Sequence, residues 1–159
     1  MRIPNSFVTR FTQASDLKLA CVFYSLIHKN TKRNLLGYEI TVKQTTLVSL
    51  CGFSVSTVKR AASSLLKSGF IKSQKRQTNA PGKLGTYTYT IEAISTASKY
   101  FTMDKKLMSR LNGNEFRVYA MCCKLSDSSH KSFFQSYNDL SQLLGMSRQD
   151  VLRTIEKLV

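Results

Sequence analysis

The chain has 159 residues, of which 42% are hydrophobic and only two are prolines, a composition that excludes a disordered tail. No apolar run reaches the roughly 18 residues of a membrane span, and the first residues lack a signal-peptide pattern. The formal net charge of +15 favours a polyanionic partner.

The first half predicts helices, a strand and a hairpin. Ser15 and Ser54 are the predicted caps of the first and third helices, and Gly52 is the expected left-handed terminator of the second. The apolar stripe of the third helix is expected at positions 55, 58, 62, 65 and 66. The predicted elements are a helix over 15–30, a strand over 38–42, helices over 43–51 and 55–68, and hairpin strands over 70–72 and 86–91.

The second half predicts the same order of helices. Residues 93–99 can form a short connecting helix, with Tyr100 and Phe101 packed against one of the units. Asn114 is the predicted cap of the next helix and Asn138 that of the one after it. The remaining expectations are a strand over 132–137, a helix ending at 144, a turn at 145–147 and a last helix from 148 to the end.

The two halves repeat one another. Residues 15–19 (SDLKL) recur chemically as residues 114–118 (NEFRV), and residues 47–54 recur as residues 140–147. The offset shrinks from 99 to 93 residues, which two copies of one unit with different loops explain. Because Val159 corresponds to Leu66, the second copy stops before its hairpin, and we expect the chain to be a piece of a longer protein.

The order helix, strand, helix, tight turn, helix, hairpin resembles the winged-helix family of helix-turn-helix DNA-binding domains. The residues that carry the resemblance are Leu47-x-x-Leu50-x-Gly52-Phe53-Ser54-x-x-x-Val58, then Leu65-Leu66-x-x-Gly69-Phe70-Ile71, then the basic hairpin. The resemblance implies a mainly α fold with small β-hairpins (α+β), built as two winged helix-turn-helix domains in tandem. Domain 1 would span 1–92, a connector 93–106, and domain 2, truncated before its wing, 107–159.

Positive charge is concentrated in the first unit. Residues 40–91 contain eight basic residues and no acidic one, whereas residues from Glu92 onward contain ten basic and seven acidic residues. Such a field attracts and steers a polyanion. A solvated basic face without a partner is the plainer alternative for each side chain.

The resemblance places the third helix of each unit in the major groove, and the hairpin along the backbone or in the minor groove. The first recognition helix would contribute Ser54, Ser56, Thr57, Lys59, Arg60, Ser64 and Lys67, the helix before it Lys43, Thr45 and Thr46, and the wing Lys72, Lys75, Arg76 and Lys83. The second recognition helix would contribute Ser147, Arg148, Gln149, Arg153 and Lys157. Asp150 repels phosphate but can accept a hydrogen bond from cytosine. Tyr87 and Tyr89 are expected to pack within the hairpin rather than stack on bases.

An enzyme is not expected. His28 and His130 lie 102 residues apart with no metal-ligand spacing around them, and neither a phosphate-binding glycine loop nor a nucleophile elbow is present. No cofactor and no metal are expected. The cysteines Cys21, Cys51, Cys122 and Cys123 show no CxxC spacing and are interpreted as buried free thiols.

Sequence-specific binding of double-stranded DNA is therefore the expected function. Linked winged-helix pairs resemble plasmid replication initiators, and the stretch Leu111-x-Gly113-Asn114-Glu115-Phe116-Arg117-Val118-Tyr119 resembles a helix of phage and plasmid replication proteins. This favours replication initiation on a plasmid, phage or other mobile element, in the cytoplasm of a prokaryote. The alternatives are a transcriptional regulator at a promoter operator and a winged-helix protein-interaction module, and a homodimer stays open as a partner.

Overall fold

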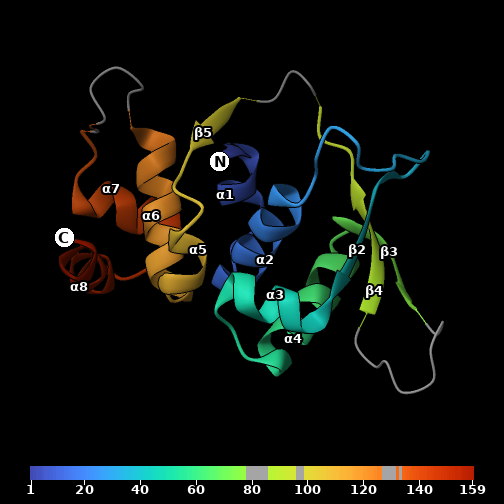
Figure 1. Cartoon of the computed structure of the whole chain (residues 1–159). Helices are drawn as coiled ribbons and strands as arrows, with labels where there is room; N and C mark the ends of the chain where they lie inside the picture. Colours follow the sequence, from blue (N-terminus) through green and yellow to red (C-terminus); the bar gives the residue numbers. More distant parts are fainter. Residues whose placement is uncertain (78–85, 96–98, 127–131, 133) are drawn as a thin grey trace.

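The computed structural model describes residues 1–77, 86–95, 99–126, 132 and 134–159, and these form an α+β fold (Figure 1). The helices of the first half are α1 (Ser6–Arg10), α2 (Ala14–Ser25), α3 (Gln44–Cys51) and α4 (Val55–Lys67). Those of the second half are α5 (Leu107–Arg110), α6 (Gly113–Leu125), α7 (Tyr137–Leu144) and α8 (Arg148–Leu158). The strands are β1 (Arg2–Pro4), β2 (Gly37–Lys43), β3 (Ile71–Arg76), β4 (Thr86–Glu92) and β5 (Tyr100–Thr102).

The strands form two antiparallel sheets. The larger one has the order β2-β4-β3, and its register pairs Ile40 with Tyr89 and Gln74 with Tyr89 on the two sides of the central strand. The smaller one joins β1 to β5. The predicted strand at 38–42 and the hairpin are therefore confirmed. The described part of the hairpin excludes residues 78–85, where predicted Lys83 lies.

The repeat is visible in the helix boundaries. Helices α2 and α6 begin 99 residues apart, and α3 and α7 as well as α4 and α8 begin 93 residues apart. Gly52 and Gly145 end α3 and α7 with left-handed φ angles of 64° and 59°. Ser54 and Ser147 then cap α4 and α8, each accepting a hydrogen bond from the backbone N–H three residues on.

One continuous hydrophobic core runs through both halves. It includes Phe7 of α1, Leu47 of α3, Phe70 before β3 and Phe116 of α6, all no more than 1% exposed. The ring of Phe70 meets those of Phe7 and Phe11 edge to face, with centroids 5.5 and 5.2 Å apart. Because the same core packs both units, they hold a fixed relative position.

Several helix starts differ from the predictions. Helix α2 begins at Ala14, after Gln13, and ends at Ser25 instead of near Asn30. Helix α6 is capped by Asn112, not Asn114, because Asn112 and Glu115 form a capping box. The spacing of Asn112 and Glu115 is a local signal for the observed cap of α6, whereas Gln13 makes no side-chain bond to the start of α2.

The predicted strand at 132–137 is wrong for its described residues, since 132 and 134–136 belong to no strand and Tyr137 begins α7. Ser136, not Asn138, caps α7 through a capping box with Asp139. In the connector, 93–95 and 99 are not helical and 96–98 lie outside the described residues. The predicted packing of Tyr100 and Phe101 is confirmed, since Phe101 is buried in the core and Arg2 lies over the ring of Tyr100. The two residues belong to β5, whose pairing with β1 no local pattern signals.

Candidate nucleic-acid interface

Helix α4 presents a polar, basic face to solvent. Its buried side is Val58, Ala61, Ala62 and Leu65, and packing of this side against α2 and α3 leaves the opposite face free. The predicted stripe was wrong at both ends, since Val55 and Leu66 are 45% and 42% exposed. A shallow hollow lies on the free face, lined by Ser56, Lys59, Arg60 and Ser63. Three of these four residues belong to the predicted recognition surface.

Ser63 is the residue that the predicted site lacks. It lies one turn beyond Lys59 and Arg60 and two turns beyond Ser56 on the same side of the helix. Subtracting the predicted apolar stripe from the helix already places Ser63 on the outward face, although it was not among the predicted DNA contacts.

The N-terminus of α4 carries a cluster of hydroxyls. Ser54 Oγ accepts from the backbone N–H of Thr57 at 3.3 Å and lies 3.0 Å from Ser56 Oγ and 2.9 Å from Thr57 Oγ1. Ser54 and Ser56 are exposed and Thr57 is half-buried. Backbone N–H groups and hydroxyls at a helix N-terminus suit an anionic oxygen, because the helix dipole is positive there.

Ser64 differs from the other predicted contacts. It is half-buried, and its Oγ donates to Asp16 Oδ2 at 2.5 Å, which joins α4 to α2. Its hydroxyl is thus engaged inside the protein, and its role is to hold the two helices together. Lys67, in the last turn of α4, is exposed.

The residues predicted before α4 are placed at one end of the sheet. Lys43 ends β2 and leads directly into α3, and it is exposed. Thr45 and Thr46 follow in the first turn of α3 and are exposed as well. These three side chains therefore start the helix that precedes the turn into α4.

The edge strand β3 carries the described cations of the hairpin. Lys72, Lys75 and Arg76 are exposed. Lys72 lies at a register shift between Ile71 and Ser73, a bulge that re-aims a side chain at a sheet edge. Across the sheet, the pKa of Glu39 is lowered by hydrogen bonds from Lys32 and Asn34 and, more weakly, by the charge of Lys75.

Tyr89 is packed inside the hairpin sheet, as predicted. It is 1% exposed, and its ring centroid lies 4.7 Å from that of Phe23. Tyr87 is half-buried, with its ring 5.9 Å from that of Tyr89. These rings fix the sheet against α2.

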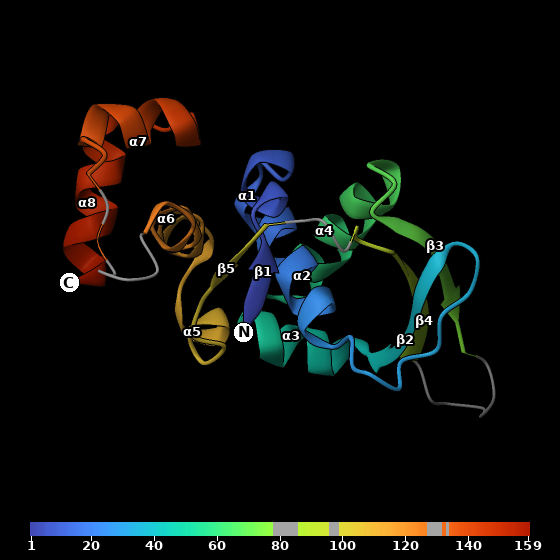
Figure 2. The same cartoon turned by 90° about the horizontal axis from the view of Figure 1, so that it is seen from above.

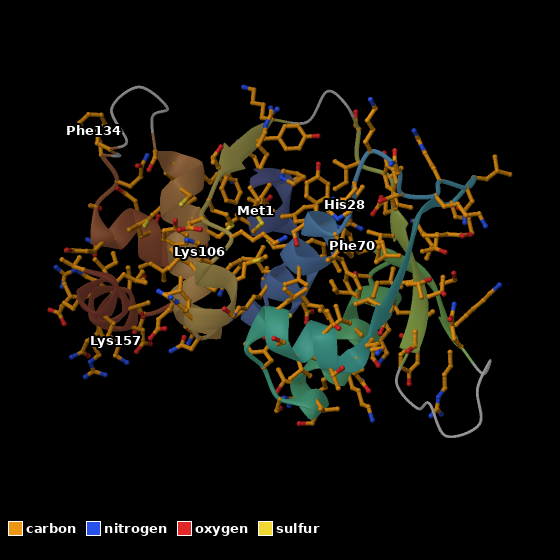
Figure 3. The ribbon with its side chains drawn as sticks, in the orientation of Figure 1. Met1, His28, Phe70, Lys106, Phe134 and Lys157 are labelled. Carbon is orange, nitrogen blue, oxygen red and sulfur yellow. The ribbon has the colours of Figure 1, made fainter. Side chains whose placement is uncertain are left out.

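Helix α8 repeats the arrangement with a weaker charge. Arg148, Gln149, Arg153 and Lys157 are exposed, while Val151 and Thr154 are buried. Ser147 Oγ donates to Asp150 Oδ2 at 2.6 Å, so this carboxylate belongs to the helix cap. Figure 3 shows Lys157 on the lower side of the view, where the turn between α3 and α4 also lies.

The lysine and arginine side chains of α4, β3 and α8 form no ion pair with a carboxylate in the described ranges. Two ion pairs are present there, Arg10–Glu92 at 2.7 Å and Lys32–Glu39 at 3.0 Å, and neither involves α4, β3 or α8. Uncompensated charge on one face produces a field that an anion can neutralise.

Nothing in the described part of the chain resembles a metal centre. No group of three or more His, Cys, Asp or Glu side chains is close enough there to hold a metal ion. The four cysteines are free, with Cys21 and Cys51 buried and Cys122 and Cys123 half-buried. Burial raises the pKa of the Cys51 thiol to about 12. No described helix is long and apolar enough to cross a membrane.

Comparison of the chain with models of protein families, with curated proteins and with solved structures found no match.

Proposed function

We propose that this chain binds double-stranded DNA in a sequence-specific way, as two winged helix-turn-helix units in tandem. The observation that carries the proposal is the free face of α4, where Lys59 and Arg60 line a hollow between two serines and make no ion pair with a described residue. The left-handed turn at Gly52, followed by a capped helix with an exposed basic face, is the arrangement that a recognition helix requires.

Each part of the surface then has its own role. Arg60 donates two hydrogen bonds to a guanine, a contact worth about 1–3 kcal/mol of discrimination. Lys43, Thr45 and Thr46 contact the backbone beside it, and Lys72, Lys75 and Arg76 follow the phosphates along the hairpin. In the second unit, Gln149 suits adenine and Arg153 suits guanine.

The process we propose is replication initiation on a plasmid, phage or other mobile element. It rests on the resemblance of the paired units to replication initiators, and binding to several repeats at an origin would support it. A site overlapping a promoter would favour a transcriptional regulator instead.

The test of DNA binding is selection of bound sequences from a pool of random duplexes. We expect one enriched motif with two parts, because each recognition helix reads its own half-site. Failure to enrich any sequence, together with no retention of duplex at physiological salt, would contradict the proposal and favour a protein-interaction module.

Two variants separate base reading from backbone contact. Arg60→Ala should relax the preference at one position, whereas Lys75→Ala should weaken binding to selected and random duplexes alike. Lys29→Ala, an exposed lysine outside this surface, is the control and should leave both affinities unchanged. Equal effects of the first two variants on both kinds of duplex would refute the assignment of α4.

Salt dependence gives a third measurement. With 6–10 phosphate contacts, affinity should fall roughly 10³–10⁵-fold between 50 and 200 mM salt. Lys75→Ala should reduce the slope of log affinity against log salt by about one contact.

A further inference from the structure

The two units are arranged around an approximate two-fold axis. Strand β1 precedes α1 and β5 precedes α5, and the two strands pair with each other antiparallel, with Ile3 opposite Phe101 at the centre. Two equivalent antiparallel strands whose central residues face each other are related by a two-fold rotation.

The helices that follow obey the same relation. Helix α2 packs against its equivalent α6. The first residues of these helices, Ala14 and Gly113, meet each other, since a Cβ built on Gly113 would lie 3.1 Å from the Cβ of Ala14. In a two-fold arrangement, a residue close to the axis contacts its own equivalent.

A charged residue of α2 makes a hydrogen bond across this interface. Lys18 of α2 is fully buried and its Nζ donates to the carbonyl of Leu111 in the other unit. Its equivalent, Arg117 of α6, is half-buried, and burial lowers the pKa of its guanidinium.

The figures show a similar relation for the helices around the two turns. In Figure 2, α3 and α7, and α4 and α8, lie on opposite sides of the β1–β5 pair. In Figure 1, β5 lies in the upper part of the molecule, and both α4 and α8 lie in the lower part. The axis therefore runs from the small sheet toward the end of the molecule that carries both third helices.

We propose that the two units read an inverted repeat, with the half-site of α8 running opposite to that of α4 on the complementary strand. This inference rests on the proposed function and specifies its DNA. In two-fold dimers, the symmetry of the protein dictates a palindromic site, with half-site centres about 10–10.5 base pairs apart or a multiple of this. Here the axis lies inside one chain, so a single copy suffices for both half-sites.

Because α4 and α8 carry different side chains, the two half-sites need not have the same sequence. Their orientation is therefore tested with one pair of arginines that occupy equivalent positions. Arg60 and Arg153 lie 93 residues apart, at the same position of their helices. On a duplex selected by the wild-type chain, methylation interference should show one guanine whose contribution disappears in Arg60→Ala and another whose contribution disappears in Arg153→Ala. We expect these two guanines on opposite strands. Two guanines on the same strand would overturn the inverted arrangement.

A second measurement makes the two reading surfaces more alike, with Leu152 still in the place of Lys59. Gln149→Ser, Asp150→Thr and Glu156→Ser change exposed residues of α8 to those at the equivalent places of α4, which are Ser56, Thr57 and Ser63. From a pool with roughly 30 random base pairs, this triple variant should enrich similar half-sites on opposite strands.

The outcomes separate the two proposals. Similar half-sites on the same strand, or a lone half-site without a fixed second one, would overturn the inverted repeat and leave DNA binding standing. No enrichment by the wild-type chain would overturn DNA binding itself. Interference with the wild-type chain and the two single Arg→Ala variants decides the orientation even where the triple variant fails to fold.

Discussion

Lys18 is a cation that the protein buries at the interface between its two units. The side chain is fully buried, and its Nζ lies 4.4 Å from the ring centroid of Phe53 and 5.7 Å from that of Phe116. Burial lowers its pKa from 10.5 to about 8, against the opposing effects of Cys51 and Glu115. Two aromatic faces and one carbonyl offset part of the desolvation, so the charge is retained at a cost in stability.

The stability of the protein should depend on pH through this residue. Between pH 8 and 10.5 the unfolded chain holds more protons at this site than the folded chain, so this contribution to stability rises with pH. Below pH 8 both states are protonated and the cost of burial is complete. The free energy of unfolding of Lys18→Met minus that of the wild type should therefore be largest near pH 7 and decrease toward pH 10.

Because one pKa unit corresponds to about 1.4 kcal/mol, we expect a decrease of roughly 1–3 kcal/mol. Denaturant titrations of both proteins at pH 7, 8, 9 and 10 measure it. The buried thiols act in the opposite direction above pH 9, but they are present in both proteins and largely cancel in the difference. A difference that stays constant from pH 7 to 10 would show that Lys18 does not titrate in this range.

The turns between the second and third helices have the same backbone but different surroundings. Gly52 and Gly145 both adopt left-handed φ angles. A Cβ on Gly52 would lie 2.3 Å from the carbonyl oxygen of Ser109, whereas a Cβ on Gly145 would meet nothing within 4 Å. The first turn is thus pressed against α5 of the other unit, and the second is open.

These two glycines form a matched pair of mutations. Gly145→Ala should cost about 1–2 kcal/mol, the strain of an L-residue in the left-handed region. Gly52→Ala should cost a further 1–3 kcal/mol, because the backbone of Ser109 has to move. Urea midpoints at unchanged slope measure both losses. Equal losses of stability in the two variants would mean that the backbone of α5 moves away from the first turn without a measurable cost.

The sequence predicts elements well where the signal is local and poorly where it is tertiary. The turn at Gly52, the cap at Ser54 and the bounds of α4 follow from nearby residues, and all were predicted. The pairing of β1 with β5 links residues about a hundred positions apart in two three-residue strands, which are too short for a period to be seen. Exposure of Val55 and Leu66 depends on where neighbouring helices end, which the helical period does not reveal.

The candidate interface likewise has residues that a local pattern predicts and residues whose environment depends on tertiary contacts. The exposed positions of α4, β3 and α8 follow from subtracting the apolar stripe of each element, and most of the predicted residues are exposed. Thr57 and Ser64 are half-buried instead, and the hydroxyl of Ser64 donates a hydrogen bond to Asp16 on a different helix. The sequence predicts the repeat. The two-fold relation between the repeated units is seen only in the structure.

On the scale of the whole molecule, Lys18 connects the first turn to the second unit. Its amine contacts the ring of Phe53, between α3 and α4, and the carbonyl of Leu111, at the end of α5. Because these contacts join the turn before α4 to the second unit, we expect them to contribute to the distance between α4 and α8. Two linked modules bind far more tightly to a double site than to a single one only when their geometry matches the spacing of the half-sites.

Loss of the amine should therefore change the tolerance for spacing more than the affinity of either unit. We expect Lys18→Met to bind a single half-site within about twofold of the wild type, and to bind the double site about tenfold more weakly at the preferred spacing. Duplexes with one or two base pairs inserted or removed between the half-sites should lose less affinity in the variant than in the wild type. Titrations of this spacer series, with Lys29→Met as the exposed control, measure the effect. If the variant shows the same dependence on spacing as the wild type, the rest of the shared core sets the distance between the two helices and Lys18 does not.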